Sequence, residues 1–111
     1  MTSVLDLGSA ELRRLCARHS PEEIARARAA VAFERHAAAE KHWRMLLALS
    51  VETALTARAV LHTPDFASRF AFARAQSRAA AGAERLAAAA RGRAEKLRRA
   101  ADRLLYQNER P

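Results

Sequence analysis

The sequence predicts an all-α protein: a long antiparallel two-helix hairpin with a coiled-coil-like, alanine-rich seam, preceded by a short N-terminal helix. Alanine, arginine, leucine and glutamate dominate the 111 residues, a composition typical of long helices. With three glycines, three prolines and few β-branched residues, no stretch resembles a β-strand. A chain of this length has room for one domain, so we expect a single domain over residues 1–111.

The first helix is predicted over residues 9–19, after an irregular lead over residues 1–8. Ser9 has a side chain suited to the N-cap, and Glu11 places a negative charge in the first turn, where the helix dipole favours it. A semi-apolar face follows at helical spacing and comprises Leu12, Leu15, Cys16 and His19. This face allows the short helix to fold back on the hairpin, but nothing in the sequence requires it.

The second helix is predicted over residues 21–62. Ser20 is suited to its N-cap, Pro21 takes the first helical position, and Glu23 stands three residues after the cap to complete a capping box. No glycine or proline follows Pro21 within this range, so the helix can run uninterrupted for about 60 Å.

The chain is predicted to reverse at Thr63-Pro64-Asp65. Threonine is expected to cap, proline to open, and aspartate to face the dipole of a third helix over residues 64–107. Gly82 and Gly92 lie inside this helix, where each costs about 1 kcal/mol relative to alanine or permits close approach of a partner backbone. Two helices of nearly equal length joined by a tight turn pack most economically as an antiparallel pair.

Apolar residues at spacings of three, four and seven predict the seam between the long helices. In the later helix the predicted seam comprises Ala83, Leu86, Ala90, Ala94, Leu97, Ala101 and Leu104. In the earlier helix it comprises Ile24, Val31, Ala38, Met45 and Leu49. Because alanine buries little area, such a seam implies close helix approach with modest stabilisation.

Residues 43–55 carry more apolar side chains than one seam can bury. The side chains predicted to bind a partner are Trp43, Leu47, Val51 and Leu55. Intramolecular cover remains open as an alternative, either from the short first helix or from the aromatic residues Phe66, Phe70 and Phe72. Without that cover, another protein or a second copy of the chain is expected to pack here.

Positive charge is concentrated in the last part of the chain. Residues 1–68 contain nine Lys/Arg and eight Asp/Glu, and residues 69–111 contain eleven and four, so the net charges are +1 and +7 and add to the +8 of the chain. The predicted basic face comprises Arg74, Arg78, Arg85, Arg91, Arg98, Arg99 and Arg103. Such a face can bind nucleic-acid phosphates, an acidic protein or an anionic membrane surface. The fourth interpretation is that the face contacts only solvent and keeps the helix soluble.

No constellation of catalytic residues is recognisable, so we expect a protein that is not an enzyme and that needs no cofactor. His36 and Glu40 lie one turn apart, but such a pair is ordinarily an i,i+4 contact on a helix surface, and no metal site is expected. The sequence contains no phosphate-binding loop, nucleophile elbow or metalloprotease motif.

The expected location is the bacterial cytoplasm. The single cysteine, Cys16, cannot form an internal disulfide and fits a reducing compartment. No apolar run approaches the roughly 20 residues of a membrane span, and the N-terminus does not have the pattern of a signal peptide. Arginine supplies 18 of the 20 basic residues and alanine is abundant, which is typical of a GC-rich bacterial genome.

The arrangement of helices and charge from Pro21 to Tyr106 resembles small coiled-coil proteins of bacterial type III export, namely the stalk protein of the export ATPase and the helical-hairpin secretion chaperones. The resemblance lies in shape and charge and covers about three quarters of the chain, without a diagnostic motif. It implies a partner-binding hairpin that serves as adaptor, chaperone or stalk. The alternative hypothesis is a nucleic-acid-associated protein that binds phosphates through the basic last helix.

Overall fold

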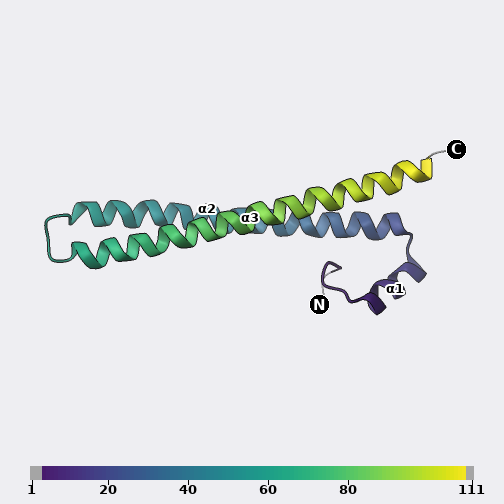
Figure 1. Ribbon diagram of the computed structural model, residues 1–111, viewed down its shortest axis with the longest axis horizontal. Helices are drawn as coiled ribbons and strands as arrows, with labels where there is room; N and C mark the ends of the chain where they lie inside the picture. The colour runs from purple at the N-terminus through teal and green to yellow at the C-terminus, as the bar shows by residue number, and fades with distance from the viewer. Residues whose placement is uncertain (1–3, 110–111) are drawn as a thin grey trace. The chain divides into compact units, whose positions relative to one another are not determined.

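The computed structural model describes residues 4–109, with side chains up to residue 107, and that part of the chain contains three helices and no strand. The helices are α1 (Ser9–Arg18), α2 (Pro21–Ala59) and α3 (Phe66–Glu109). α2 and α3 run antiparallel and are joined by a short connection (Figure 1). The prediction of an all-α helical hairpin with a short first helix is therefore confirmed. Residues 1–3 of the predicted lead lie outside the described residues.

The start of α1 differs from the prediction by one residue. Ser9 is already helical, and Gly8 is the N-cap. The carboxylate of Glu11 caps this end, because it accepts the backbone N–H of Gly8 at 3.1 Å. A first-turn glutamate that reaches back to the N-cap N–H replaces the serine side chain in this role.

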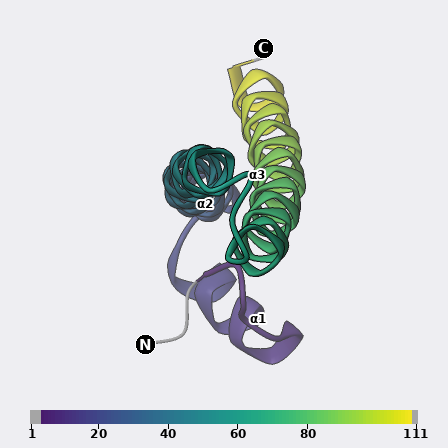
Figure 2. The ribbon, with the colours of Figure 1, turned by 90° about the vertical axis from the view of Figure 1, so that its left-hand side faces the viewer.

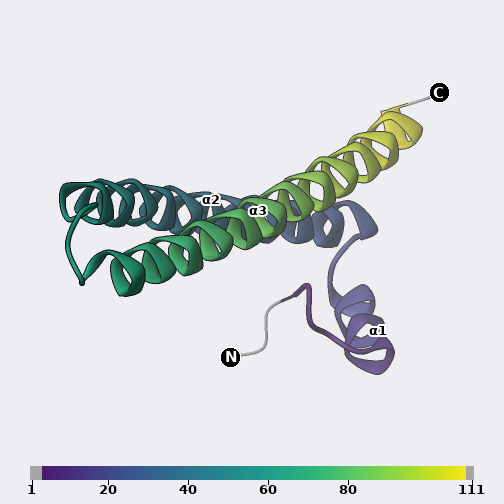
Figure 3. The same ribbon diagram turned by 60° about the vertical axis from the view of Figure 1, so that its left-hand side comes forward.

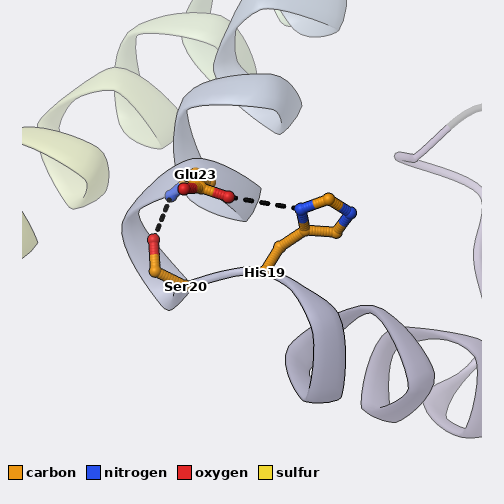
Figure 4. Close-up of polar contacts among 3 residues, drawn as sticks. All are labelled: His19, Ser20 and Glu23. Atoms are coloured by element: carbon orange, nitrogen blue, oxygen red, sulfur yellow. Dashed lines mark hydrogen bonds and ion pairs between the residues drawn. The ribbon is translucent and has the colours of Figure 1, made fainter.

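The start of α2 follows the predicted cap. The backbone N–H of Glu23 donates to the hydroxyl of Ser20 at 3.2 Å, and Pro21 is the first helical residue (Figure 4). The carboxylate of Glu23 lies 3.2 Å from Nδ1 of His19, so it links the connection after α1 to the first turn of α2.

The connection between α2 and α3 is longer than predicted and spans residues 60–65. The Thr63 hydroxyl does not cap α3 but donates to the carbonyl of Val60 at 2.7 Å, closing the turn that ends α2. The backbone carbonyl of Asp65 accepts the N–H of Arg69 at 3.1 Å, which starts the α3 hydrogen-bond ladder. α2 accordingly ends at Ala59 instead of residue 62, and α3 begins at Phe66 instead of Pro64.

The helices pack as two compact units. Unit 1 contains the lead, α1, α2 up to His36 and α3 from Ala89; unit 2 contains residues 37–88, which include the connection. The prediction of one domain is not tested by this division and stays a prediction.

The core of unit 1 is formed by the N-terminal lead and the long helices. Leu5 is buried together with Ala32 of α2 and Ala94 of α3, and Val31, Phe33 and Leu97 pack around them. No residue of the short helix α1 is fully buried or belongs to this core, although Leu12 and Leu15 are half-buried. Figure 3 shows α1 leading through a short link into the first turn of α2. Within unit 1, the fully buried contact with the two long helices is therefore made by Leu5 of the lead.

The core of unit 2 consists of alanines alone: Ala57, Ala73, Ala80, Ala83 and Ala87. Small side chains let the helix backbones approach closely, and α2 and α3 lie side by side when viewed from the connection (Figure 2). Ser50 and Thr53 are half-buried in α2, and the Thr53 hydroxyl donates to the carbonyls of Leu49 and Ser50 at 2.9 and 3.0 Å. Those bonds satisfy a polar group that would otherwise be costly in a seam.

The predicted seam of α3 is largely confirmed, whereas that of α2 is wrong in its second half. In α3, Ala83, Ala94 and Ala101 are buried, but Leu86 is 70 % exposed and Ala87 takes its place. In α2 the buried and half-buried residues recur at spacings of three and four, and they include Ala29, Ala32, His36, Ala39, Trp43, Leu46, Ser50, Thr53 and Ala57. Ala38, Met45 and Leu49 were predicted in this seam but are exposed. The fully buried positions of this repeat hold only alanine, whereas the larger Trp43 and Leu46 are half-buried.

Candidate partner-binding surface

Three large apolar residues of α2 form one exposed line, called here the α2 strip: Leu47, Val51 and Leu55. They are spaced at i, i+4 and i+8, so they lie on one side of the helix. Val51 is 53 % and Leu55 is 59 % exposed, and Leu47 is also exposed. Trp43, predicted with them, is half-buried and belongs to the repeat that faces α3. The structure therefore brings together three of the four predicted residues.

Arginines stand at both ends of the α2 strip. Arg44 and Arg58 are exposed and lie on the same side of the helix as Val51, at seven residues before and after it. At 1.5 Å per residue they are about 21 Å apart along the helix. Arg44 also contacts Glu40, one turn earlier, at 3.2 Å. An apolar centre with charged ends is the pattern expected of a surface that accepts another helix.

A shallow groove of about 360 Å³ lies in unit 2, next to the connection. Its lining residues come from both helices and from the connection, and they comprise Ser50, Ala54, Ala57, Arg58, Leu61, Phe66, Phe70, Ala73, Arg74 and Ser77. The rings of Phe66 and Phe70 stack with centroids 5.4 Å apart, and the guanidinium of Arg74 lies 5.9 Å from the centroid of Phe70. Phe72, predicted to help cover the apolar surplus, is 56 % exposed instead. The groove is on the flank of the hairpin that carries Arg58, and so it extends the α2 strip toward α3.

The seven arginines predicted as a basic face are all exposed. Arg74, Arg78 and Arg85 lie in unit 2, and the other four lie in unit 1. In unit 1, Glu95 pairs with Arg91 at 3.2 Å and with Arg99 at 3.8 Å, which neutralises part of the local charge. Whether the seven act as one basic face stays a prediction.

A bidentate ion pair in unit 1 joins the lead to α2. Both oxygens of the Asp6 carboxylate accept hydrogen bonds from the guanidinium of Arg35, one of them at 3.3 Å. The hydrogen bond to Arg35 is the main reason why the pKa of Asp6 is lowered, and the charges of Arg35 and Arg93 lower this pKa further. Bidentate pairing fixes the geometry of the lead beside buried Leu5.

Sequence reasoning missed this docking of the lead. Leu5 and Asp6 stand in an irregular segment, so no periodicity marks the apolar residue or its acidic neighbour. Among residues 4–109, no group of three or more His, Cys, Asp or Glu residues is placed to hold a metal ion. Within the same range no helix is both long enough and apolar enough to span a bilayer.

Comparison with known protein families, with curated proteins and with solved structures finds no match for this chain. The resemblance to type III export proteins therefore rests on the sequence features given above.

Proposed function

We propose that this protein is a non-enzymatic, partner-binding helical hairpin whose α2 strip accepts a helix of another protein or of a second copy. The observation that supports the proposal is the exposure of Leu47, Val51 and Leu55 on one side of α2. These three residues are not part of the seam with α3, whose fully buried residues in unit 2 are alanines. Monomeric proteins rarely leave a contiguous apolar line of this kind uncovered. The resemblance to type III export proteins makes an adaptor, chaperone or stalk of a bacterial cytoplasmic export apparatus the specific form of the proposal.

The magnitude of the surface energy supports the same proposal. Burying a Val or Leu side chain completely contributes about 1.5–3 kcal/mol, so covering the three residues of the α2 strip offers several kcal/mol to a partner. Arg44 and Arg58 add charge at the two ends and set the register of an incoming helix with acidic residues about four turns apart. The apolar centre supplies affinity, and the charged ends supply specificity.

The test is affinity purification with the full chain, followed by mass spectrometry and by analytical ultracentrifugation of the purified protein. The variant Val51→Glu/Leu55→Glu places two charges on the α2 strip. The control Ala38→Glu places one on an exposed position of the opposite flank of α2. We expect the wild type and the control to retain the same partner, or to dimerise, and the double variant to lose it. A wild-type chain that is monomeric and retains no partner, or a partner that the double variant retains fully, would refute the proposal.

A second candidate function is non-specific binding of nucleic-acid phosphates, and the observation that favours it is the exposure of Arg98 and Arg103 without an ion pair to any described residue. A protein of this kind binds duplex DNA with an affinity that falls as salt rises, with a log–log slope of about −0.9 per phosphate neutralised. Fluorescence anisotropy with labelled duplex at about 50 mM salt measures this, and Arg98→Gln/Arg103→Gln is expected to reduce the slope by about two. Absence of binding at that salt concentration eliminates this candidate.

A further inference from the structure

Unit 2 has a second exposed apolar surface, on the flank opposite the α2 strip. The sequence did not reveal it, because Leu86, Met45 and Leu49 were predicted to lie in the seam. Phe72 and Leu86 of α3 are 56 % and 70 % exposed, and Met45 and Leu49 of α2 are exposed as well. In α3 the two large residues belong to a continuous apolar repeat with spacings of three and four: Phe72, Ala75, Ala79, Gly82 and Leu86. We call this repeat the α3 stripe. It has the spacing of a helix-packing seam, but α2 does not occupy it.

The α3 stripe and the α2 strip lie on different flanks of the hairpin. The groove next to the connection shows which residues flank the seam on one side, namely Ala54 and Arg58 of α2 with Phe70 and Ser77 of α3. On a helical wheel, Leu49 of α2 and the α3 stripe fall on the other side of the respective buried residues. A helix that covers the α3 stripe therefore leaves the α2 strip free.

The stripe has room for close packing near its centre. A Cβ added at Gly82 meets no other atom within 4 Å except the guanidinium of Arg85, at 4.0 Å, so nothing but the tip of a flexible side chain lies there. Ala75 and Ala79 are equally small, whereas the large side chains stand at the two ends. Small residues at a crossing point allow two helix backbones to approach, and large residues fill the space where the helices diverge.

The charges beside the α3 stripe are positive and unbalanced. Arg78 and Arg85 follow its outer edge, both are exposed, and neither forms an ion pair with any residue that the structure describes. Residues 37–88 as a whole contain seven Lys/Arg and four Asp/Glu, a net charge of +3. A partner that carries carboxylates along one edge would meet charges that the chain itself leaves without a counter-charge.

Unit 1 contains an example of the same recognition within this chain. There, Leu5 fills the space between Ala32 and Ala94, and the carboxylate of the next residue, Asp6, binds the guanidinium of Arg35. An apolar residue thus packs on alanines of the two helices while an adjacent carboxylate pairs with an arginine at the edge. For a stripe of about two heptads, an amphipathic helix has the matching period.

We propose that the α3 stripe is a second docking surface, and that it binds an amphipathic helix with an apolar seam and a row of Asp or Glu along one edge. A second copy of this chain fits less well. If a second copy packed antiparallel on the stripe with Ala79 at the centre, the Arg78 side chains of the two molecules would lie close together. The two copies of unit 2 are also both positively charged, so they would repel each other. The inference does not depend on the α2 strip, so the protein is able to hold two partners on opposite flanks.

The experiment uses the full chain and two synthetic helical peptides about three heptads long. The peptides share one leucine–alanine seam; one carries Glu along an edge of that seam and the other carries Arg at the same positions. Binding is measured by fluorescence anisotropy at low and high salt. We expect the Glu-edged peptide to bind at least about tenfold more tightly than the Arg-edged peptide, and the difference to shrink at high salt.

Two variants and a control locate the binding. Leu86→Glu places a charge on the stripe and is expected to abolish binding of the Glu-edged peptide. Arg78→Glu/Arg85→Glu is expected to reverse the preference between the peptides, which an unfolded protein cannot do. Val51→Glu, on the α2 strip, is expected to leave peptide binding unchanged, which separates this surface from that of the proposed function. The inference is overturned if neither peptide binds, if both bind equally, or if the wild type is a dimer that Leu86→Glu dissociates.

Discussion

Leu86 and Leu97 provide a matched test of where the helix seam runs. Both are leucines of α3 at positions that the sequence assigned to the seam, and they are eleven residues apart. Leu97 packs against the unit 1 core of Leu5, Ala32 and Ala94, whereas Leu86 is 70 % exposed. Replacing each by alanine removes the same atoms from two different environments.

The two substitutions are expected to lower the free energy of unfolding by clearly different amounts. A fully buried Leu→Ala substitution costs about 2–5 kcal/mol, and Leu97 is partly buried, so we expect Leu97→Ala to lower the free energy of unfolding by about 1–2 kcal/mol. Complete burial of a leucine contributes about 1.5–3 kcal/mol, and Leu86 has roughly a third of that burial, so Leu86→Ala should cost about 0.5 kcal/mol. Alanine also has the higher helix propensity, which reduces the second value further.

Circular dichroism at 222 nm during heating and during urea unfolding measures both effects. For a chain of this size, 1 kcal/mol corresponds to a change in Tm of about 4–6 °C. We expect a lower Tm for Leu97→Ala and nearly the wild-type Tm for Leu86→Ala. Equal destabilisation by the two substitutions would show that Leu86 faces α2, and it would refute both the observed seam and the α3 stripe.

Three further predictions concern stability. Gly92→Ala should raise the free energy of unfolding by about 0.5–1 kcal/mol, because no atom lies within 4 Å of the added Cβ and glycine is unfavourable inside a helix; a Tm at or below that of the wild type would contradict this. Leu5→Ala should lower the Tm and increase hydrogen exchange at Ala32 and Ala94, whereas Cys16→Ala, at an exposed position of α1, should change neither. Because Arg35 lowers the pKa of Asp6, the Asp6–Arg35 pair stabilises the fold above the ordinary carboxyl pKa of 3.8 and loses its effect as the pH falls through the lower folded-state pKa. Asp6→Asn should therefore lower the Tm at neutral pH, and its difference in Tm from the wild type should shrink as the pH is lowered below 3.8.

The sequence predicted the helices well because their ends are set by local chemistry. Ser20, Pro21 and Glu23 form a cap that requires no tertiary contact, and the structure contains it. The third helix was predicted two residues early because Pro64 is equally suited to a turn and to a first helical position, and the hydrogen bond from Thr63 to Val60 decides for the turn. Whether Pro64 lies in the turn or in the helix depends on how α2 ends, and the preferences for N-cap residues do not describe that.

The seam of α2 was predicted poorly because large apolar residues were given priority. Met45 and Leu49 are more hydrophobic than Ser50 or Thr53, yet the first two are exposed and the second two are half-buried. Where two helices pack through alanines, the size of a side chain determines whether it fits into the seam more than its hydrophobicity does. The spacing of the alanines in α3 contained this information, since Ala80, Ala83 and Ala87 follow the repeat without Leu86.

In unit 2 the small side chains lie in the seam and the large apolar side chains lie on the proposed binding surfaces. Every buried residue of unit 2 is an alanine, while leucine, valine, methionine and phenylalanine occupy both outer flanks of its two helices. Hydrophobic stabilisation is roughly proportional to the apolar area removed from water, so a molecule that covered these exposed side chains would gain stabilisation that the hairpin alone does not have. Binding of a partner at a concentration 100 times its Kd adds about 2.7 kcal/mol to stability, which is large compared with what an alanine seam provides. The exposed apolar residues of unit 2 are therefore the physical reason for proposing, as above, that this hairpin binds a partner.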